Sequence, residues 1–283
     1  MLKSILQKIP LIGQYYQIEE LTAKYGPKAI RTQQELFLQQ LRREARYADP
    51  RHLIHFEHQT YSQNGEDGIV EEILRRIGVR NRTFLEIGTG SGLQCNTAMR
   101  LAQGWSGWWV EGNPRAPRKM RRHFANALDS GQLQVINALV TAENIGALLA
   151  EHGVPDEVDL FSLDVDRNTY WIWNALTQFR PRAIVIEYNA SYPAGVDWKV
   201  EYDAAKWWNG THYYGASLKA LELLGKSFGY SLVGCESTGV NCFFVRDDLV
   251  GDRFLGPFNS ETHFEPPRYF LTRLEGHPRG FAD

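Results

Sequence analysis

Hydrophobic residues alternate between strand-like and helix-like spacing from Tyr61 to Arg246. Short apolar runs rich in β-branched and aromatic residues predict strands, and longer segments with apolar residues three or four apart predict helices. The predicted strands are RTFLEIG, WSGWWVEGN, QLQVINALV, DLFSLDVD, RAIVIEYN, YSLVGC and GVNCFFVR. The predicted helices are EDGIVEEILRRIG, NTAMRLAQ, APRKMRRHFANALDS, AENIGALLAEHG, TYWIWNALTQF and GASLKALELLGKSFG. This alternation predicts an α/β fold with a doubly wound, mostly parallel seven-stranded sheet, and the two closely spaced last strands predict an antiparallel edge.

Residues 1–57 have a different texture, being polar and rich in Gln, Arg and Leu. The leucines of TQQELFLQQLRREARYA have a helix-like spacing, so we predict a helical N-terminal extension over 1–57. The α/β domain is then expected over 58–250, with a C-terminal tail over 251–283.

Residues 190–215, here called the aromatic loop, lack a regular hydrophobic period. The aromatic loop carries Trp198, Trp207, Trp208, Tyr213 and Tyr214. Irregular segments of this length inside a compact domain are often functional, so we predict a substrate lid whose aromatic rings stack on an acceptor. A purely structural loop anchored by its aromatic residues is the alternative.

The composition is that of an ordinary globular protein. With 43% apolar residues and a formal net charge of −2, the chain gives no electrostatic reason to expect a nucleic acid partner. The three cysteines have no metal-binding or disulfide spacing, which indicates a reducing compartment. The N-terminus lacks the features of a signal peptide, and no apolar run reaches the ~20 residues of a membrane span, so we expect a cytoplasmic protein.

The segment FLEIGTGSG predicts a strand that ends in Glu86 and runs into a glycine loop and a helix. Glycines at this point allow a tight turn and a close approach of the backbone to a ligand. The spacing is GxGxG, and Leu93 occupies the position at which a dinucleotide fingerprint needs its last glycine. A hydride-transfer cofactor is therefore disfavoured.

The next predicted strand ends in Glu111, and a carboxylate at that position suits a bidentate hydrogen bond to vicinal ribose hydroxyls. No lysine or serine of the phosphate-binding type follows the glycines. A nucleoside cofactor without a required phosphate fits these residues, and S-adenosylmethionine is such a cofactor.

Two further strands end in polar residues. Asp164 and Asp166 follow one strand, and Glu187 and Asn189 follow the next. Buried carboxylates are costly unless they are paired or metal-bound, and Mg²⁺ prefers oxygen ligands. We therefore predict a divalent metal site of Asp164, Asp166, Glu187 and Asn189, which would lower the pKa of an acceptor hydroxyl.

A metal-free site is the alternative. Asp164 would then orient the cofactor or substrate, and Glu187, Asp166 or His212 would act as the general base. His212 lies in the aromatic loop just before a predicted helix. A helix cap is the plain structural alternative for Asp166.

The sequence resembles class I S-adenosylmethionine-dependent methyltransferases in FLEIGTGSG and WWVEGNP. It resembles the FkbM-type branch in YSQNGEDGIV, FLEIGTGSGLQCNT, GWSGWWVEGN and LFSLDVDRNTYWIW, over residues 60–246. Members of that branch mostly methylate oxygen atoms of sugars and natural products. The departure lies at Asp166 and Arg167, where the branch usually has glutamate and glycine.

The resemblance implies a Rossmann-like methyltransferase fold and assigns cofactor contacts. It places Glu86, Gly88, Gly90 and Gly92 around the amino-acid end and the ribose, with Glu111 on the ribose hydroxyls. It also places Asn137 and Ala138 at the adenine, Gln63 at the methionine part and Asp164 beside the reactive methyl group.

These residues favour an enzyme, an O-methyltransferase that acts on a hydroxyl of a sugar, glycan or natural-product acceptor. One alternative is an interaction module that binds the nucleoside without methyl transfer, and another is an NAD-dependent oxidoreductase. The expected partner is a small-molecule or glycan acceptor, and the N-terminal helices offer a surface for a homo-oligomer.

Overall fold

The structure is a computed structural model that describes residues 10–271. The described chain divides into two compact units, residues 10–48 and residues 49–271. The second unit thus begins before residue 58, the predicted start of the α/β domain, and it includes residues 251–271.

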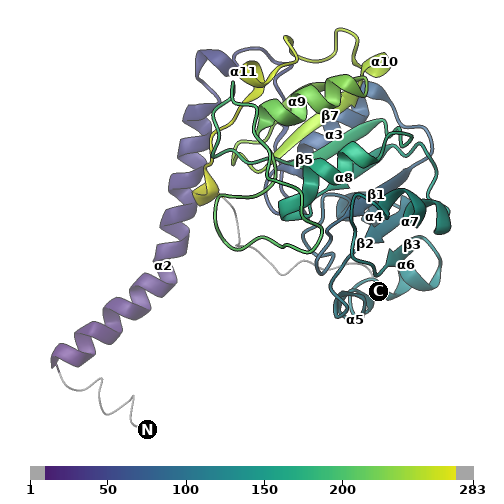
Figure 1. The fold of residues 1–283 in the computed structure, drawn as a ribbon. Coiled ribbons are helices and arrows are strands. Elements are labelled where there is room, and N and C mark those ends of the chain that lie inside the picture. The colour runs from purple at the N-terminus through teal and green to yellow at the C-terminus, as the bar shows by residue number, and fades with distance from the viewer. Residues whose placement is uncertain (1–9, 272–283) are drawn as a thin grey trace. The chain divides into compact units, whose positions relative to one another are not determined.

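The first unit consists mainly of one helix, α2 (Pro10–Leu41), followed by the short 3-10 helix η1 (Ala45–Tyr47) (Figure 1). This confirms the predicted N-terminal helix over its described part, whereas residues 1–9 of the expected extension lie outside the described residues. Pro27 lies inside α2. Among residues 10–271, no helix is long and apolar enough to span a membrane.

The second unit contains the seven predicted strands in one sheet, in the order β3-β2-β1-β4-β5-β7-β6. The strands are β1 (Thr83–Ile87), β2 (Ser106–Val110), β3 (Leu133–Ile136), β4 (Leu160–Leu163), β5 (Ala183–Glu187), β6 (Tyr230–Cys235) and β7 (Asn241–Arg246). Strands β1 to β5 pair in parallel, and β7 pairs antiparallel with both β5 and β6. The predicted α/β sheet is therefore confirmed, with its one antiparallel strand next to the edge strand β6.

The register brings the carboxyl ends of the central strands to one edge. Ile87 at the end of β1 pairs with Val110 of β2 and with Leu163 of β4, and Leu163 pairs in turn with Ile186 of β5. The chain runs outward from β1 to β2 and β3 on one side and to β4 and β5 on the other. Ligands of open α/β sheets bind at such a reversal of strand order, beyond the carboxyl ends of the strands.

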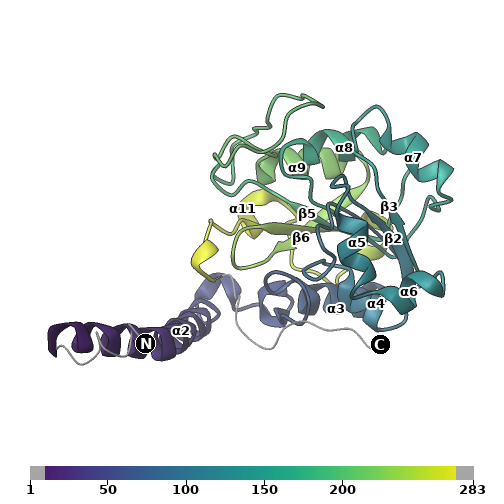
Figure 2. The same ribbon diagram turned by 90° about the horizontal axis from the view of Figure 1, so that it is seen from below.

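Helices cover both faces of the sheet (Figure 2). One face carries α3 (Glu66–Ile77), α4 (Ala98–Ala102), α5 (Ala116–Arg121) and α6 (Ala125–Asp129), and the other carries α7 (Ile145–Glu151), α8 (Thr169–Ala175) and α9 (Leu218–Ser227). The shorter elements are η2 (Leu53–Phe56), η3 (Asp166–Asn168), α10 (Asp247–Val250), α11 (Ser260–His263) and η4 (Tyr269–Leu271).

One predicted helix, APRKMRRHFANALDS, is wrong in length, because the chain forms α5 and α6 with a break between them. Phe124 occupies the break with non-helical backbone angles, φ −129° and ψ 24°, and packs its ring edge-on against Trp109, with 4.8 Å between the ring centroids.

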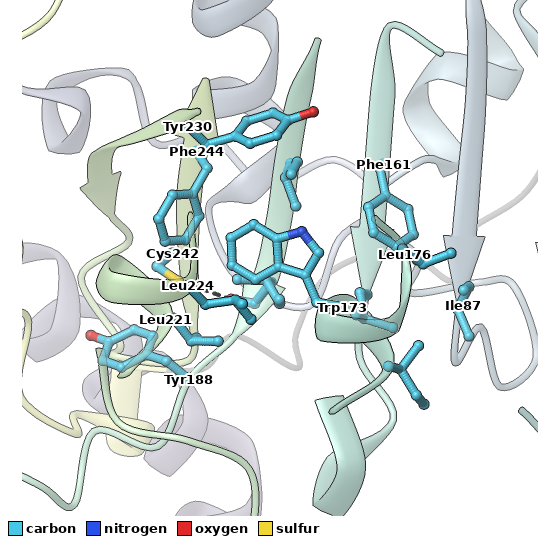
Figure 3. Packing of buried hydrophobic residues seen from close by; sticks show 14 of the residues in the cluster. Ile87, Phe161, Trp173, Leu176, Tyr188, Leu221, Leu224, Tyr230, Cys242 and Phe244 are labelled. Atoms are coloured by element: carbon cyan, nitrogen blue, oxygen red, sulfur yellow. Dashed lines mark hydrogen bonds between the residues drawn. The ribbon is translucent and has the colours of Figure 1, made fainter. Parts of the chain in front are cut away.

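Two hydrophobic clusters fill the space between the sheet and its helices. Figure 3 shows the cluster under α8 and α9, where the Trp173 ring lies among Phe161, Leu176, Leu224 and Phe244. Both clusters are built from alternating strand residues, for example Phe84 on one face and Leu85 on the other. The sheet is thus fixed from both sides, and its strand tips form a rigid base for a site.

Candidate functional site

Glu86 fixes the segment that joins the glycine loop to α4. Strand alternation turns its side chain away from Leu85 and Ile87, toward the start of α4. One carboxylate oxygen accepts hydrogen bonds from the Asn96 backbone N (2.9 Å) and the Ser162 hydroxyl (3.3 Å). The other accepts from the Thr97 backbone N (2.9 Å) and hydroxyl (2.5 Å). Burial raises the pKa of Glu86, and these four donors oppose the shift.

The three loop glycines are required for different reasons. At Gly88 a Cβ atom would lie 1.5 Å from the Asp164 carbonyl oxygen, so the glycine lets β1 and β4 end side by side. At Gly92 a Cβ atom would overlap the buried rings of Trp109 and Phe124. At Gly90 the space is open, and its φ of 56° favours glycine. Gly92 therefore serves packing, while Gly88 and Gly90 line the cavities described next.

Two adjoining cavities lie above the strand tips. The larger, of about 280 Å³, is lined by Glu111, Ala138, Leu139, Val140, Ile172 and Trp207, among others. The smaller, of about 200 Å³, is lined by Gln63, Glu86, Ser91, Gln94, Asn96 and Asn241, among others. Gly88, Gly90 and Asp164 line both. Together the cavities fall within the size range of ordinary small-molecule sites, about 300–1,000 Å³.

Glu111 lies at the end of β2 and lines the larger cavity. Its two oxygens accept hydrogen bonds from the backbone N atoms of Gly90 (2.6 Å) and Asn113 (2.8 Å). Asn137 supports the same turn, since its amide donates to the backbone oxygens of Glu111 (2.7 Å) and Asn113 (3.1 Å). Asn137 is not among the cavity-lining residues, so the structure gives it a supporting place, while Ala138 lines the cavity.

Three carboxylates meet at the ends of β4 and β5. Asp164, Asp166 and Glu187 each offer one oxygen, and these atoms all lie within 4.8 Å of one another. Burial and the neighbouring Asp166 charge raise the pKa of Asp164 to about 6. Burial and the same two aspartates raise the pKa of Glu187 well above its usual range, and Glu187 and Asp164 are hydrogen-bonded to each other. The close approach of Asp164 and Glu187 therefore favours retention of a proton by this pair of carboxyl groups.

Asp166 occupies a strained position in this cluster. Its φ of 54° lies in the left-handed region that non-glycine residues seldom adopt. It does not cap the following helix, since the N-cap residue of α8 is Asn168 and no side chain caps it. The side chain instead stands exposed at the mouth of the larger cavity, and the backbone N donates to Asp164 Oδ1 (3.4 Å).

Neither Asn189 nor His212 lines the two cavities. The Asn189 amide group donates to the backbone oxygens of His212 (2.7 Å) and Tyr214 (2.8 Å), and its side-chain oxygen accepts from the Ser191 backbone N (3.1 Å). With its amide engaged on both sides, Asn189 fixes the aromatic loop, and its place as a metal ligand stays a prediction. The His212 side chain is exposed and lines neither cavity, so its position gives no support to the prediction that it is the general base.

Two further residues lie at this site: Tyr214, which the sequence analysis placed in the predicted lid, and Asn241, which it did not single out. The mostly buried Tyr214 has a raised pKa because of burial, the Glu187 charge and its hydrogen bond to Tyr269. Asn241 begins β7 directly opposite Glu187 and lines the smaller cavity. Only the antiparallel pairing of β5 with β7 places Asn241 there, and the strand order is not readable from local sequence patterns.

The residues fit a nucleoside with a cationic tail and a hard divalent ion. Neither Lys, Arg nor His lines the smaller cavity, whereas Glu86 and Asp164 do. The larger cavity has an apolar wall and the Glu111 carboxylate. At the cluster, one Glu187 oxygen is buried without a hydrogen-bond partner, and carboxylate oxygens are the preferred ligands of Mg²⁺.

No protein-family model matches this chain, and no curated protein matches it in sequence. In structure it is similar to the N-terminal domain of EvdMO1 solved with SAH bound, at 12% identity and a TM-score of 0.41, over 68% of this chain and 81% of that one. It is similar to an O-methyltransferase family protein from Burkholderia thailandensis, at 11% identity and a TM-score of 0.40, over 64% of this chain and only 57% of that one. It is also similar to an S-adenosylmethionine-dependent methyltransferase from Clostridium acetobutylicum ATCC 824, at 12% identity and a TM-score of 0.38, over 64% and 90% of the two chains. Similarity at this level transfers no function from those proteins to this chain.

Proposed function

We propose that this chain is an S-adenosylmethionine-dependent methyltransferase. One observation carries the proposal: the joined cavities run from the Glu111 carboxylate to Asp164, and the smaller one has acidic but no basic lining residues. A ribose suits Glu111, and a cationic methionine end suits the acidic cavity. A dinucleotide would bring phosphates to the glycine loop, where the smaller cavity has no cationic lining residue and the larger cavity has only Lys206 beside the carboxylates of Glu111, Asp164 and Asp166.

The acceptor is proposed to be a hydroxyl of a sugar, glycan or other natural product, as in the FkbM-type branch. S-adenosylmethionine, when bound, supplies an electrophilic methyl group on its sulfonium. Asp164 lines both cavities, so with the cofactor bound its carboxylate would be placed to accept the proton of the acceptor hydroxyl. Glu187, hydrogen-bonded to Asp164, holds this carboxylate in position.

A divalent cation is proposed at Asp164, Asp166 and Glu187. Like-charged groups this close are repulsive, and a cation removes that repulsion. The ion, when bound, supplies Lewis acidity that lowers the pKa of an acceptor hydroxyl. The three carboxylates that would bind the ion are also the ones whose mutual repulsion destabilises the metal-free protein, which supports the proposal.

The aromatic loop is proposed to cover the acceptor. Trp198 stacks on Tyr192, with ring centroids 4.1 Å apart, and Tyr214 approaches Glu187 and Asp164. Flat aromatic faces beside hydrogen-bonding carboxylates suit the apolar faces and hydroxyls of a sugar ring. The alternative interaction module, which binds the nucleoside without turnover, would leave the costly carboxylate cluster without a use.

The direct test is turnover. The protein is incubated with S-adenosylmethionine, Mg²⁺ and a panel of monosaccharides, glycosides and phenolic natural products, and methylated products are detected by mass spectrometry. We expect S-adenosylhomocysteine release that depends on an acceptor and falls in Asp164→Asn. The matched control is Asp129→Asn, an exposed aspartate paired with Arg121, which should retain activity. Cofactor binding without turnover on any acceptor would favour the interaction module.

A further inference from the structure

The tip of the aromatic loop stands in solvent, yet one of its residues forms part of the larger cavity. Residues 205–213 are exposed along the whole tip. Trp207 is the most exposed aromatic residue among them, at 64%, and it lines the cavity together with Lys206. A large apolar side chain so exposed at a cavity is typical of a ligand-binding surface.

A second exposed apolar residue stands beside Trp207. Leu139, which follows β3, is 47% exposed and also lines the cavity. Both flank Gly112, since a Cβ atom there would lie 3.6 Å from the Trp207 ring and 3.6 Å from the Leu139 side chain. The remaining wall is apolar and includes Ala138, Val140 and Ile172. This end of the cavity is therefore suited to a flat group with apolar faces.

We propose that Trp207 is a cofactor-binding residue whose ring packs on the nucleoside base and closes the larger cavity. The inference rests on the proposed function, because it takes the ligand to be an S-adenosyl compound. It moves Trp207 from the acceptor side, where the sequence placed it, to the cofactor side. The acceptor side keeps Tyr214, which lies near the carboxylates.

The segments on either side of the tip, here called the stems of the aromatic loop, are hydrogen-bonded to the rest of the domain through Val200, Asp203 and Tyr214. The Asn168 amide donates to the Asp203 backbone oxygen (3.0 Å), and the Trp171 indole donates to the Val200 backbone oxygen (2.8 Å). On the other stem Asn189 holds Tyr214 (2.8 Å). The tip can therefore settle on a bound base without a change in the stems.

Trp208 provides an internal control. Its indole N donates to the Thr211 backbone oxygen (2.6 Å) within the tip, and its ring lies edge-on to Tyr214. Trp208 is 49% exposed and lines neither cavity. The two adjacent tryptophans are both exposed, but only Trp207 lines the larger cavity.

The test is calorimetric titration of S-adenosylhomocysteine and of 5′-methylthioadenosine, which lacks the amino-acid end, into four forms of the full chain. These are the wild type, Trp207→Ala, Trp207→Phe and Trp208→Ala. We expect Trp207→Ala to weaken both ligands by about tenfold, which is the size of one base–aromatic stacking contact. Trp207→Phe should recover most of the affinity, and Trp208→Ala should remain within about twofold of the wild type.

Tryptophan fluorescence gives an independent reading. The ligand-induced change in emission of the wild type should be lost in Trp207→Phe although binding persists by calorimetry. Wild-type affinity of Trp207→Ala for both ligands would overturn the role of Trp207 and leave the proposed function intact. A wild type that binds neither ligand would overturn the proposed function itself, and this inference with it.

Discussion

Glu86 and Glu187 are two carboxylates at the tips of parallel strands in the same sheet, and their surroundings differ sharply. Glu86 accepts four hydrogen bonds from Asn96 and Thr97, which directly precede α4, and from Ser162. Glu187 faces Asp164 and Asp166 and has one buried oxygen without a partner. The hydrogen-bonding capacity of Glu86 is met by the protein itself, whereas Glu187 keeps a buried oxygen that a bound ion could use. The comparison distinguishes a carboxylate with a structural role, Glu86, from one with a proposed role in binding and catalysis, Glu187.

The largest expected effect is a difference in thermal stability when the same substitution, Glu→Gln, is made at each of the two positions. Glu86→Gln presents an amide group to backbone N–H donors in a buried place, which should cost about 3 kcal/mol of unfolding free energy and lower the Tm by about 6–12 °C. Glu187→Gln removes repulsion and should leave the Tm unchanged or raise it. Thermal unfolding followed by circular dichroism measures both, and equal losses would remove the distinction.

The second effect concerns catalysis. Glu187→Gln should lower methyl transfer by about 100-fold, because the residue holds Asp164 and is a proposed ion ligand. Its affinity for S-adenosylhomocysteine should stay within about threefold, since Glu187 lines neither cavity. The matched control is Glu151→Gln, an exposed residue at the end of α7. Full activity of Glu187→Gln would contradict the assignment.

The third effect is a stabilisation by cation. Millimolar Mg²⁺ or Mn²⁺ should raise the Tm of the wild type by about 2–4 °C, because an ion that binds only the folded state stabilises it. The rise should be absent in Glu187→Gln and retained in Glu151→Gln. An equal rise in both variants would place the ion elsewhere.

The smallest effect is on the pH dependence of stability. The folded state raises the pKa of Asp164 from 3.8 to about 6, so between these values it holds more protons than the unfolded chain. This contribution makes stability fall as the pH rises through that window, and the raised pKa of Glu187 extends the fall upward. Denaturant titrations of the metal-free protein at several pH values should show a shallower fall in Glu187→Gln than in the wild type.

Much of the fold could be predicted because its signals are local. Alternating hydrophobic runs located all seven strands, and the carboxyl ends of the parallel strands placed Glu111, Asp164 and Glu187 at one edge. The fate of Asn189 could not be predicted, because it depends on backbone oxygens that lie more than twenty residues further along the chain. The position of Asn241 at the smaller cavity depends on the order of the strands, and the position of Trp207 at the larger cavity depends on the path of an irregular loop.

The central claim is that the joined cavities bind an S-adenosyl compound through Glu111. Its most direct test is calorimetric titration of S-adenosylhomocysteine, with NADH in parallel, into the wild type and Glu111→Ala. The account predicts saturable binding of S-adenosylhomocysteine to the wild type, no binding of NADH, and a loss of at least about tenfold in affinity for Glu111→Ala. Binding of NADH in place of S-adenosylhomocysteine, or unchanged affinity in Glu111→Ala, would contradict it.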